Sequence, residues 1–263
     1  RAIGTAEPAR IEIRPPLAAA VGIGAAAPES ATTLVEVLEW HARTTPDRTH
    51  IFLRQDDGSE QPITYGRLWR QSVRVASALG ARGIGRRDAV TIMLRTESAF
   101  FPAFFGTLLA GAIPVPIYPP FRADRIAEYA ERQVGILVNA GTRLMITFAE
   151  VERLAGLLRG RVPTLTSVTT LDALSPNLSR DQPETGALPA NPAPWLTPED
   201  PALIQYTSGS TGQPKGVLLT QANLLANVRA IVAGLEVGPA DVVVSWLPLY
   251  HDMGLIGAWL GTM

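Results

Sequence analysis

The chain of 263 residues is long enough for one large domain or two small ones with a sizeable buried core. Hydrophobic residues make up 46% and charged residues 18%, as in ordinary soluble globular proteins, and the net charge of −1 gives no reason to expect nucleic acid or an anionic membrane as partner. The absence of cysteine excludes disulfides, thiolate catalysis and cysteine metal sites, and it suits a cytoplasmic location.

The beginning of the chain is rich in alanine and proline and shows little periodicity, so residues 1–30 are expected to form a linker or loosely packed lead-in. Thr33 and Glu36 form a capping box, which predicts a helix over 34–43. Two strands joined by a turn and then a second helix are expected next, at 51–54, 61–64 and 65–79.

From residue 89 onward, short apolar strands alternate with helices. The strands are expected at 89–94, 113–117 and 143–147, and the helices at 98–111, 124–139 and 150–159. This alternation predicts an α/β fold with mostly parallel sheets flanked by helices. Seven prolines in 175–201 predict a long connecting loop. The remaining expected elements are strands at 202–207, 216–220 and 241–246, a helix at 221–235 and another from near Met253.

Residues 98–121 carry no charge and are numerous enough to suggest a transmembrane helix. Four prolines, at 114, 116, 119 and 120, break the second half of this run, so a buried helix followed by a buried strand is expected instead. The start of the chain lacks the basic and apolar regions of a signal peptide. Because the first residue is arginine and the last three look like a helix cut short, we expect a fragment of a longer chain.

The stretch YTSGSTGQPKG at 206–216 joins two expected strands and carries the chemistry of phosphate binding. Its glycines let backbone N–H groups approach an anion, its hydroxyls can donate to phosphate oxygens or ligate Mg²⁺, and its lysine supplies positive charge. The candidate nucleotide-binding residues are Thr207, Ser208, Gly209, Ser210, Thr211, Gly212 and Lys215. A strand, not a helix, leaves this loop, which excludes the common GxxxxGK[ST] class.

YTSGSTGQPKG followed by VLLTQANL resembles the signature loop of the acyl-adenylate-forming (AMP-binding) superfamily, which includes acyl-CoA synthetases, nonribosomal adenylation domains and luciferases. Upstream, ITYGRLWRQSVRVASAL, GIGRRDAVTIML and FFGTLLAGAIPVPIYPP are similar to the amino-terminal part of that family. SWLPLYHDMGLIG at 245–257 resembles its second core motif. HDMGL together with PVPIYPP is closest to fatty acyl-AMP ligases and long-chain acyl-CoA synthetases. The resemblance implies that 31–263 is part of a large adenylation domain, truncated at its carboxyl end.

His251 is the second candidate catalytic residue. Pro248 is expected to end the strand at 241–246 and so to place His251 at the carboxyl edge of a sheet, where α/β folds bind ligands. The resemblance implies that His251 lies near the substrate carboxylate, where it orients the attacking oxygen or shields it from water. The alternative is that His251 and Asp252 cap the following helix. His41 and His50 fall in segments that look exposed and receive no role.

The resemblance implies ATP-dependent adenylation of a long-chain fatty acid, giving acyl-AMP and pyrophosphate, with the acyl group then passed to an acyl carrier protein. Lys215 would offset charge on the leaving phosphates, and Thr207 would help to hold Mg²⁺. The family's magnesium-binding glutamate and carboxyl-terminal catalytic lysine would lie beyond residue 263, so the chain alone is expected to be inactive. Alternatives are a fatty acyl-CoA synthetase, a nonribosomal or polyketide loading domain, or a non-catalytic nucleotide- or acyl-binding module.

Overall fold

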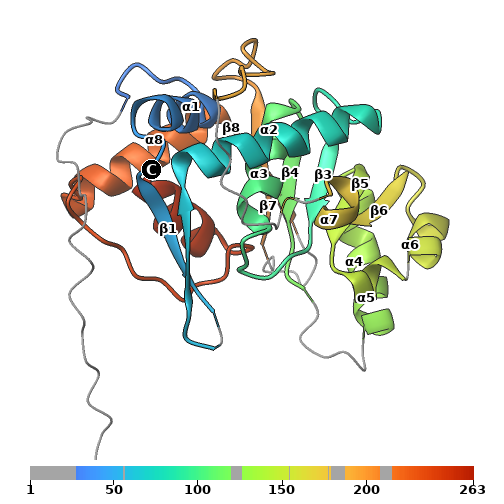
Figure 1. Ribbon diagram of the computed structural model, residues 1–263. Helices are drawn as coiled ribbons and strands as arrows, with labels where there is room; N and C mark the ends of the chain where they lie inside the picture. The colour runs from blue at the N-terminus through green and yellow to red at the C-terminus, as the bar shows by residue number, and fades with distance from the viewer. Residues whose placement is uncertain are drawn as a thin grey trace, which may run out of the picture.

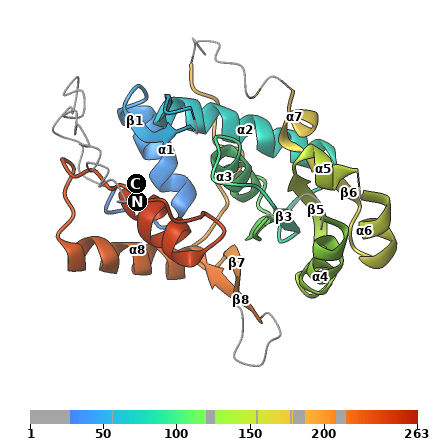
Figure 2. The ribbon, with the colours of Figure 1, turned by 90° about the horizontal axis from the view of Figure 1, so that it is seen from below.

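The computed structural model describes residues 28–55, 57–119, 126–153, 155–176, 178, 187–207 and 215–263, with backbone alone for 126–132 and 155 (Figure 1). Residues 1–27 of the lead-in expected at 1–30 therefore lie outside the described residues. In both views helix α8 (Gln221–Leu235) lies at one end of the molecule, and helices α4 (Ile126–Asn139), α5 (Ala149–Glu152) and α6 (Ala155–Arg161) lie at the other (Figure 1, Figure 2).

The described chain opens with helix α1 (Leu34–Thr44), and its predicted capping box is confirmed. The Thr33 hydroxyl accepts a hydrogen bond from the Glu36 backbone N–H at 3.1 Å, and the Glu36 carboxylate accepts one from the Thr33 N–H at 3.1 Å. The predicted hairpin and second helix follow, as the antiparallel strands β1 (Thr49–Arg54) and β2 (Glu60–Thr64) and the helix α2 (Tyr65–Ala81).

A four-stranded parallel sheet forms the centre of the fold and confirms the predicted α/β class. Its strand order is β4-β3-β5-β6, and its members are β3 (Ala89–Ile92), β4 (Ile113–Pro116), β5 (Thr142–Thr147) and β6 (Ser167–Thr170). Alternate residues of a strand face opposite sides of the sheet. On β5, Leu144 and Ile146 accordingly join a core with α1, α2 and α3, whereas Met145 joins a second core with α4 and α6.

The uncharged run from residue 98 forms helix α3 (Phe100–Leu109), every residue of which is buried, and then β4. Within the described part of the chain, no helix has the length and apolarity needed to cross a membrane. Helix α3 packs closely on α2 because Gly106 has no side chain: an added Cβ would lie 2.5 Å from Val75 Cβ and 2.9 Å from the Ser72 carbonyl oxygen.

This close approach predicts opposite effects for two helical glycine-to-alanine substitutions. Gly106→Ala is expected to lower the free energy of unfolding by about 2 kcal/mol, because the added methyl group overpacks the α2–α3 contact. Gly80→Ala on α2 is the matched control, since nothing lies within 4 Å of its added Cβ, and it is expected to raise stability by about 0.5 kcal/mol. Urea unfolding monitored by circular dichroism measures both. Equal effects of the two substitutions would contradict the close packing.

Two parts of the prediction before residue 200 were incomplete. The single helix expected at 150–159 is two helices, α5 and α6, because Arg153 forms a turn between them. Strand β6 and the one-turn helix α7 (Leu171–Leu174) were not predicted. The β6 sequence SVTT is short and mostly hydroxylic, so it lacks the apolar run by which the other strands were identified.

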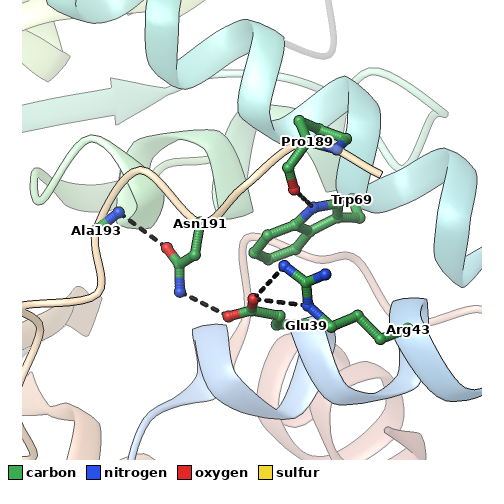
Figure 3. Close-up of polar contacts among 6 residues, drawn as sticks. All are labelled: Glu39, Arg43, Trp69, Pro189, Asn191 and Ala193. Carbon is green, nitrogen blue, oxygen red and sulfur yellow. Dashed lines mark hydrogen bonds and ion pairs between the residues drawn. The ribbon is translucent and has the colours of Figure 1, made fainter. Parts of the chain in front are cut away.

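The loop before the phosphate-binding segment is tied to the first two helices, as Figure 3 shows. The Trp69 indole N–H donates to the Pro189 carbonyl at 2.9 Å, and the Asn191 amide donates to the Glu39 carboxylate at 2.8 Å. Glu39 also pairs with Arg43 at 2.8 Å. Residues 187–200 of the predicted long loop, although they contain no helix or strand, therefore pack against α1 and α2.

Asp200 fixes the end of this loop and the start of the next strand. The Arg86 guanidinium donates to its carboxylate at 2.9 Å and also lies 5.2 Å from the centroid of the Trp195 ring. Burial alone would raise the pKa of Asp200, but hydrogen bonds from Arg86 and from the Thr197 backbone and hydroxyl lower it below its ordinary value. Asp200 is therefore ionised near neutral pH and anchors the strand that follows.

The carboxyl-terminal part consists of the antiparallel strands β7 (Pro201–Thr207) and β8 (Lys215–Thr220), helix α8, the π-helix η2 (Met253–Trp259) and the 3₁₀ turn η3 (Leu260–Thr262). The strand predicted at 241–246 is wrong. Val244 and Trp246 are 84% and 89% exposed, and the segment pairs with no strand in the described ranges. Its β-branched residues favour a strand, but a strand forms only where a neighbour satisfies its backbone groups.

Candidate functional site

The two ends of the candidate phosphate loop face each other across a strand pair. Thr207 ends β7 and Lys215 begins β8, and they are direct partners in the antiparallel ladder. Both side chains are exposed. The five candidates between them, at positions 208–212, lie outside the described residues and stay predictions. The structure thus places a hydroxyl and an ammonium group at the base of the segment that was predicted to hold phosphates.

Lys215 is the single lysine of the chain, since the other 22 of the 23 basic residues are arginines. A chain that otherwise uses arginine for positive charge carries a compact, strongly hydrated ammonium at this one position. Among the described residues, none forms an ion pair with this side chain or accepts a hydrogen bond from it. Its charge is therefore available to an anion, which fits the phosphate-binding chemistry expected of the loop.

Tyr206 fastens the base of this hairpin to helix α4, an anchor that the sequence analysis did not identify. Its hydroxyl lies 2.5 Å from Asn139 Oδ1, to which it donates a hydrogen bond. Burial raises the pKa of Tyr206, so the hydroxyl keeps its proton for this bond. Gly216 lies opposite Tyr206 in the ladder, and a Cβ there would come within 3.0 Å of the tyrosine ring. Glycine at 216 therefore leaves room for the ring across the strand pair.

Gln205 connects the hairpin to the second motif. Its side-chain amide donates to the carbonyl oxygen of Tyr250 at 3.1 Å, across 45 positions of sequence, and it is buried. Tyr250 directly precedes His251. The structure therefore joins the two predicted motifs through one buried side chain, two residues before Thr207. A glutamine within an apolar strand pattern, ALIQYT, was the one sequence feature that could have indicated this role.

His251 lies in an exposed turn and not at the end of a strand, so the strand-based reason for its placement was wrong. Its Nδ1 is 2.6 Å from the Asp252 carboxylate. Asp252 is the N-cap of η2 and accepts from the Met253 N–H at 2.7 Å, which confirms the capping alternative for the aspartate. The Met253 N–H also lies 3.4 Å from this Nδ1, so both neighbours contact one ring nitrogen, and Nε2 has no partner among the described residues. The catalytic role of His251 stays a prediction.

The expectation that His41 and His50 lie in exposed segments was also wrong. His41 is buried at 4% exposure, and His50 is partly buried in β1. Both rings stack on the ring of Tyr65. Nothing in their spacing indicates this, because the contact partners come from separate elements.

The magnesium role of Thr207 rests on the sequence. Over the described ranges, no three histidine, aspartate or glutamate side chains form a metal site. The hydroxyl at the exposed end of β7 is an oxygen ligand of the type that Mg²⁺ accepts beside phosphate oxygens.

Comparison with known proteins confirms the family that the two motifs indicated. The family described as AMP-binding enzyme matches residues 38–263. The medium-chain-fatty-acid–[acyl-carrier-protein] ligase TtuA of Teredinibacter turnerae is 28% identical, over 87% of this chain and 40% of its own length. The sulfoacetate–CoA ligase of Cupriavidus necator is 34% identical, over 87% of this chain and 43% of its own length.

Solved structures agree with the sequence relatives. A crystal structure of the fatty acyl-adenylate ligase from L. pneumophila, in complex with acyl adenylate and pyrophosphate, superposes with a TM-score of 0.72 and 28% identity. The match covers 89% of this chain and 38% of that one. The chain thus spans about 40% of the length of the relatives that it matches. Through this match over most of its residues, the chain belongs to the AMP-binding enzyme family.

Proposed function

We propose that the whole protein adenylates a fatty carboxylic acid with ATP and passes the acyl group to an acyl carrier protein, and that residues 31–263 are part of its large adenylation domain in the cytoplasm. The observation that carries this proposal is the exposed Lys215, which has no ion-pair partner among the described residues and lies opposite Thr207 at the base of the glycine- and hydroxyl-rich loop. A relative named as a fatty-acid–[acyl-carrier-protein] ligase and a fold neighbour solved with acyl adenylate and pyrophosphate support the same reaction.

In the proposed reaction a carboxylate oxygen of the fatty acid forms a bond to the α-phosphorus of ATP. The bond from that phosphorus to the bridging oxygen breaks, and pyrophosphate leaves with the electron pair. Because the protein's part in such transfers is mostly positioning and charge stabilisation, a fixed ammonium near the leaving group is the group required. Lys215 supplies it, and the loop hydroxyls and backbone N–H groups hold the phosphate oxygens. Mg²⁺, when bound, adds positive charge, and Thr207 is the proposed ligand.

His251 is proposed to act on the carboxylate side of the reaction. With Nδ1 held by Asp252, its Nε2 is free to orient the substrate or to exclude water. The buried hydrogen bond from Gln205 to Tyr250 would hold this imidazole at a fixed position relative to the phosphate loop.

A second acceptor, coenzyme A, is favoured by the 34% identical relative, which is named as a CoA ligase. The two acceptors are distinguished by supplying the whole protein with ATP, a fatty acid and either CoA or an acyl carrier protein bearing its prosthetic arm. Acyl transfer to the carrier alone is expected. Transfer to CoA alone would replace the carrier in the proposal and leave the adenylation step unchanged.

Labelling of the single lysine tests nucleotide binding on the 263-residue chain itself. An acyl-phosphate derivative of ATP transfers its acyl group to an amine near the bound phosphates, and peptide mapping separates Lys215 from the terminal amine. We expect labelling of Lys215 that ATP or pyrophosphate suppresses, and no labelled side chain in Lys215→Arg. Labelling that neither compound suppresses would contradict a phosphate site at the hairpin. Pyrophosphate release from ATP and fatty acid is expected from the whole protein and not from this chain alone.

A further inference from the structure

Two histidines and a tyrosine form a three-ring stack where α1, β1 and α2 meet. The His41 ring lies 4.4 Å from the Tyr65 ring at an interplanar angle of 12°, and the His50 ring lies 4.7 Å from it at 19°. Tyr65 is only 3% exposed, so the stack is part of the hydrophobic core. The three elements are thereby joined by rings, two of which are able to take up a proton.

The π-helix η2 joins this stack through Trp259, its final residue. The Trp259 indole N–H donates to His50 Nε2 at 3.1 Å. The same indole ring packs edge-on against the phenylalanines of α3, with ring centroids 4.9 Å apart for Phe101 and 5.4 Å for Phe104. Because Nε2 accepts this hydrogen bond, it must carry a lone pair, and the neutral imidazole must hold its proton on Nδ1.

No carboxylate among the described residues affects the proton affinity of either imidazole. The groups that face them are Arg48, which precedes β1, Tyr65 on α2, and each other. Burial raises the pKa of Tyr65 to about 12, so the phenol contributes no negative charge. Arg229, the charged side chain of α8, donates hydrogen bonds to the backbone carbonyl oxygens of Glu29 and Ala31.

The surroundings of both rings therefore favour the neutral form. Burial, followed by the charge of Arg48, lowers the pKa of His41 to about 4, and the backbone of Met263 acts in the opposite direction. Burial, followed by the charges of His41 and Arg48, lowers the pKa of His50 to about 3. Neither nitrogen of His41 has a hydrogen-bond partner in the described structure. A proton there would create a buried charge, which the backbone of Met263 offsets only in part.

We propose that His41 and His50 form a proton-sensitive latch that holds η2, the helix directly after the His251 motif, against α1 and the first hairpin. The latch is closed when both imidazoles are neutral. A proton on His50 Nε2 turns the acceptor into a donor that faces the indole N–H of Trp259, and the hydrogen bond is lost. Because η2 begins at Met253, its release would shift the turn that carries His251.

The direction of the pH dependence follows from the lowered pKa values. The unfolded chain binds a proton at each histidine below pH 6.5, whereas the folded chain stays neutral to about pH 4. Stability is therefore fully present above pH 6.5 and is lost as the pH falls from there toward 4. When the pH is lowered from 8 to 5, protonation of each latch histidine in the unfolded chain is expected to raise the unfolding equilibrium constant about 30-fold.

Urea unfolding at pH 8 and pH 5 tests the latch with non-titrating variants. His50→Gln keeps an oxygen acceptor for Trp259, and His41→Phe keeps a ring to stack on Tyr65. The double variant is expected to lose most of the acid-induced change, while His251→Gln, which alters the exposed third histidine, is expected to keep most of it. A double variant as acid-sensitive as the wild type would overturn the proposal.

Nuclear magnetic resonance of the wild-type chain tests the same proposal without a core substitution, since the chain has only three imidazole rings and five indole N–H groups to observe. The His41 and His50 signals are expected to remain those of neutral rings at pH 5.5. The Trp259 indole signal, assigned with Trp259→Phe, is expected to shift on further acidification before the other four change. Titration of the two imidazoles near pH 6.5, or a Trp259 signal that changes only with global unfolding, would overturn the latch.

Discussion

Lys215→Ala is expected to slow acyl-adenylate formation by the whole protein by a factor of about 100 to 1,000, the loss seen when one preorganised donor is removed from a developing negative charge. The chain has no other lysine, so no second ammonium side chain is present to replace it. Since the charge on the leaving pyrophosphate grows in the transition state, kcat is expected to fall more than the affinity for ATP. Pyrophosphate release at varied ATP concentration measures both.

Two control variants separate charge from shape at this position. Lys215→Arg keeps the positive charge but replaces the compact ammonium with a planar fork, so it is expected to recover about a tenth of the activity at most. Arg54→Ala removes one charge from the exposed end of β1 and is expected to leave the rate unchanged. An unchanged rate of adenylate formation in Lys215→Ala would remove the proposed mechanism.

The parts of the fold that were predicted correctly are those determined by local chemistry. The helices predicted from residues 34 and 221 begin there, and in both a threonine hydroxyl, of the predicted cap Thr33 and of Thr220, accepts the N3 backbone N–H within one helical turn. The alternation of apolar strands and helices likewise predicted the parallel sheet, since each crossover is local. The strand at 241–246 failed because strand formation depends on a partner, and composition alone does not supply one.

The candidate site shows the same difference between local features, which could be predicted, and long-range contacts, which could not. Its ligand types were readable from YTSGSTGQPKG, because glycine, hydroxyl and lysine chemistry is contained within eleven neighbouring residues. The contacts that hold the site in place could not be predicted from the sequence. The Tyr206–Asn139 and Gln205–Tyr250 hydrogen bonds span 67 and 45 positions, and the rings around Tyr65 come from separate elements. Contacts of this kind depend on how elements pack, which periodicity does not specify.

Gly254→Ala is expected to lower the free energy of unfolding by about 3 kcal/mol, at the upper end of the cost of overpacking a core. Its Cβ would lie 2.3 Å from the Pro248 carbonyl oxygen and 3.0 Å from that of Leu247. These are backbone atoms and do not rotate away. The Pro248 carbonyl also accepts the hydrogen bond from the His251 N–H at 3.1 Å, so the turn that carries His251 must move as well.

Gly257→Ala in the same helix provides the matched control. Its added Cβ would meet only the Met253 sulfur, 3.2 Å away at the end of a flexible side chain, so the change in stability is expected to stay within about 0.5 kcal/mol. Urea unfolding at pH 8 measures both variants above the range in which the latch histidines titrate. Because Gly254→Ala displaces the turn as well as the helix, adenylate formation by the whole protein is expected to fall even where the variant is fully folded. Wild-type stability in Gly254→Ala would mean that η2 does not pack on the 247–248 backbone as closely as the structure shows.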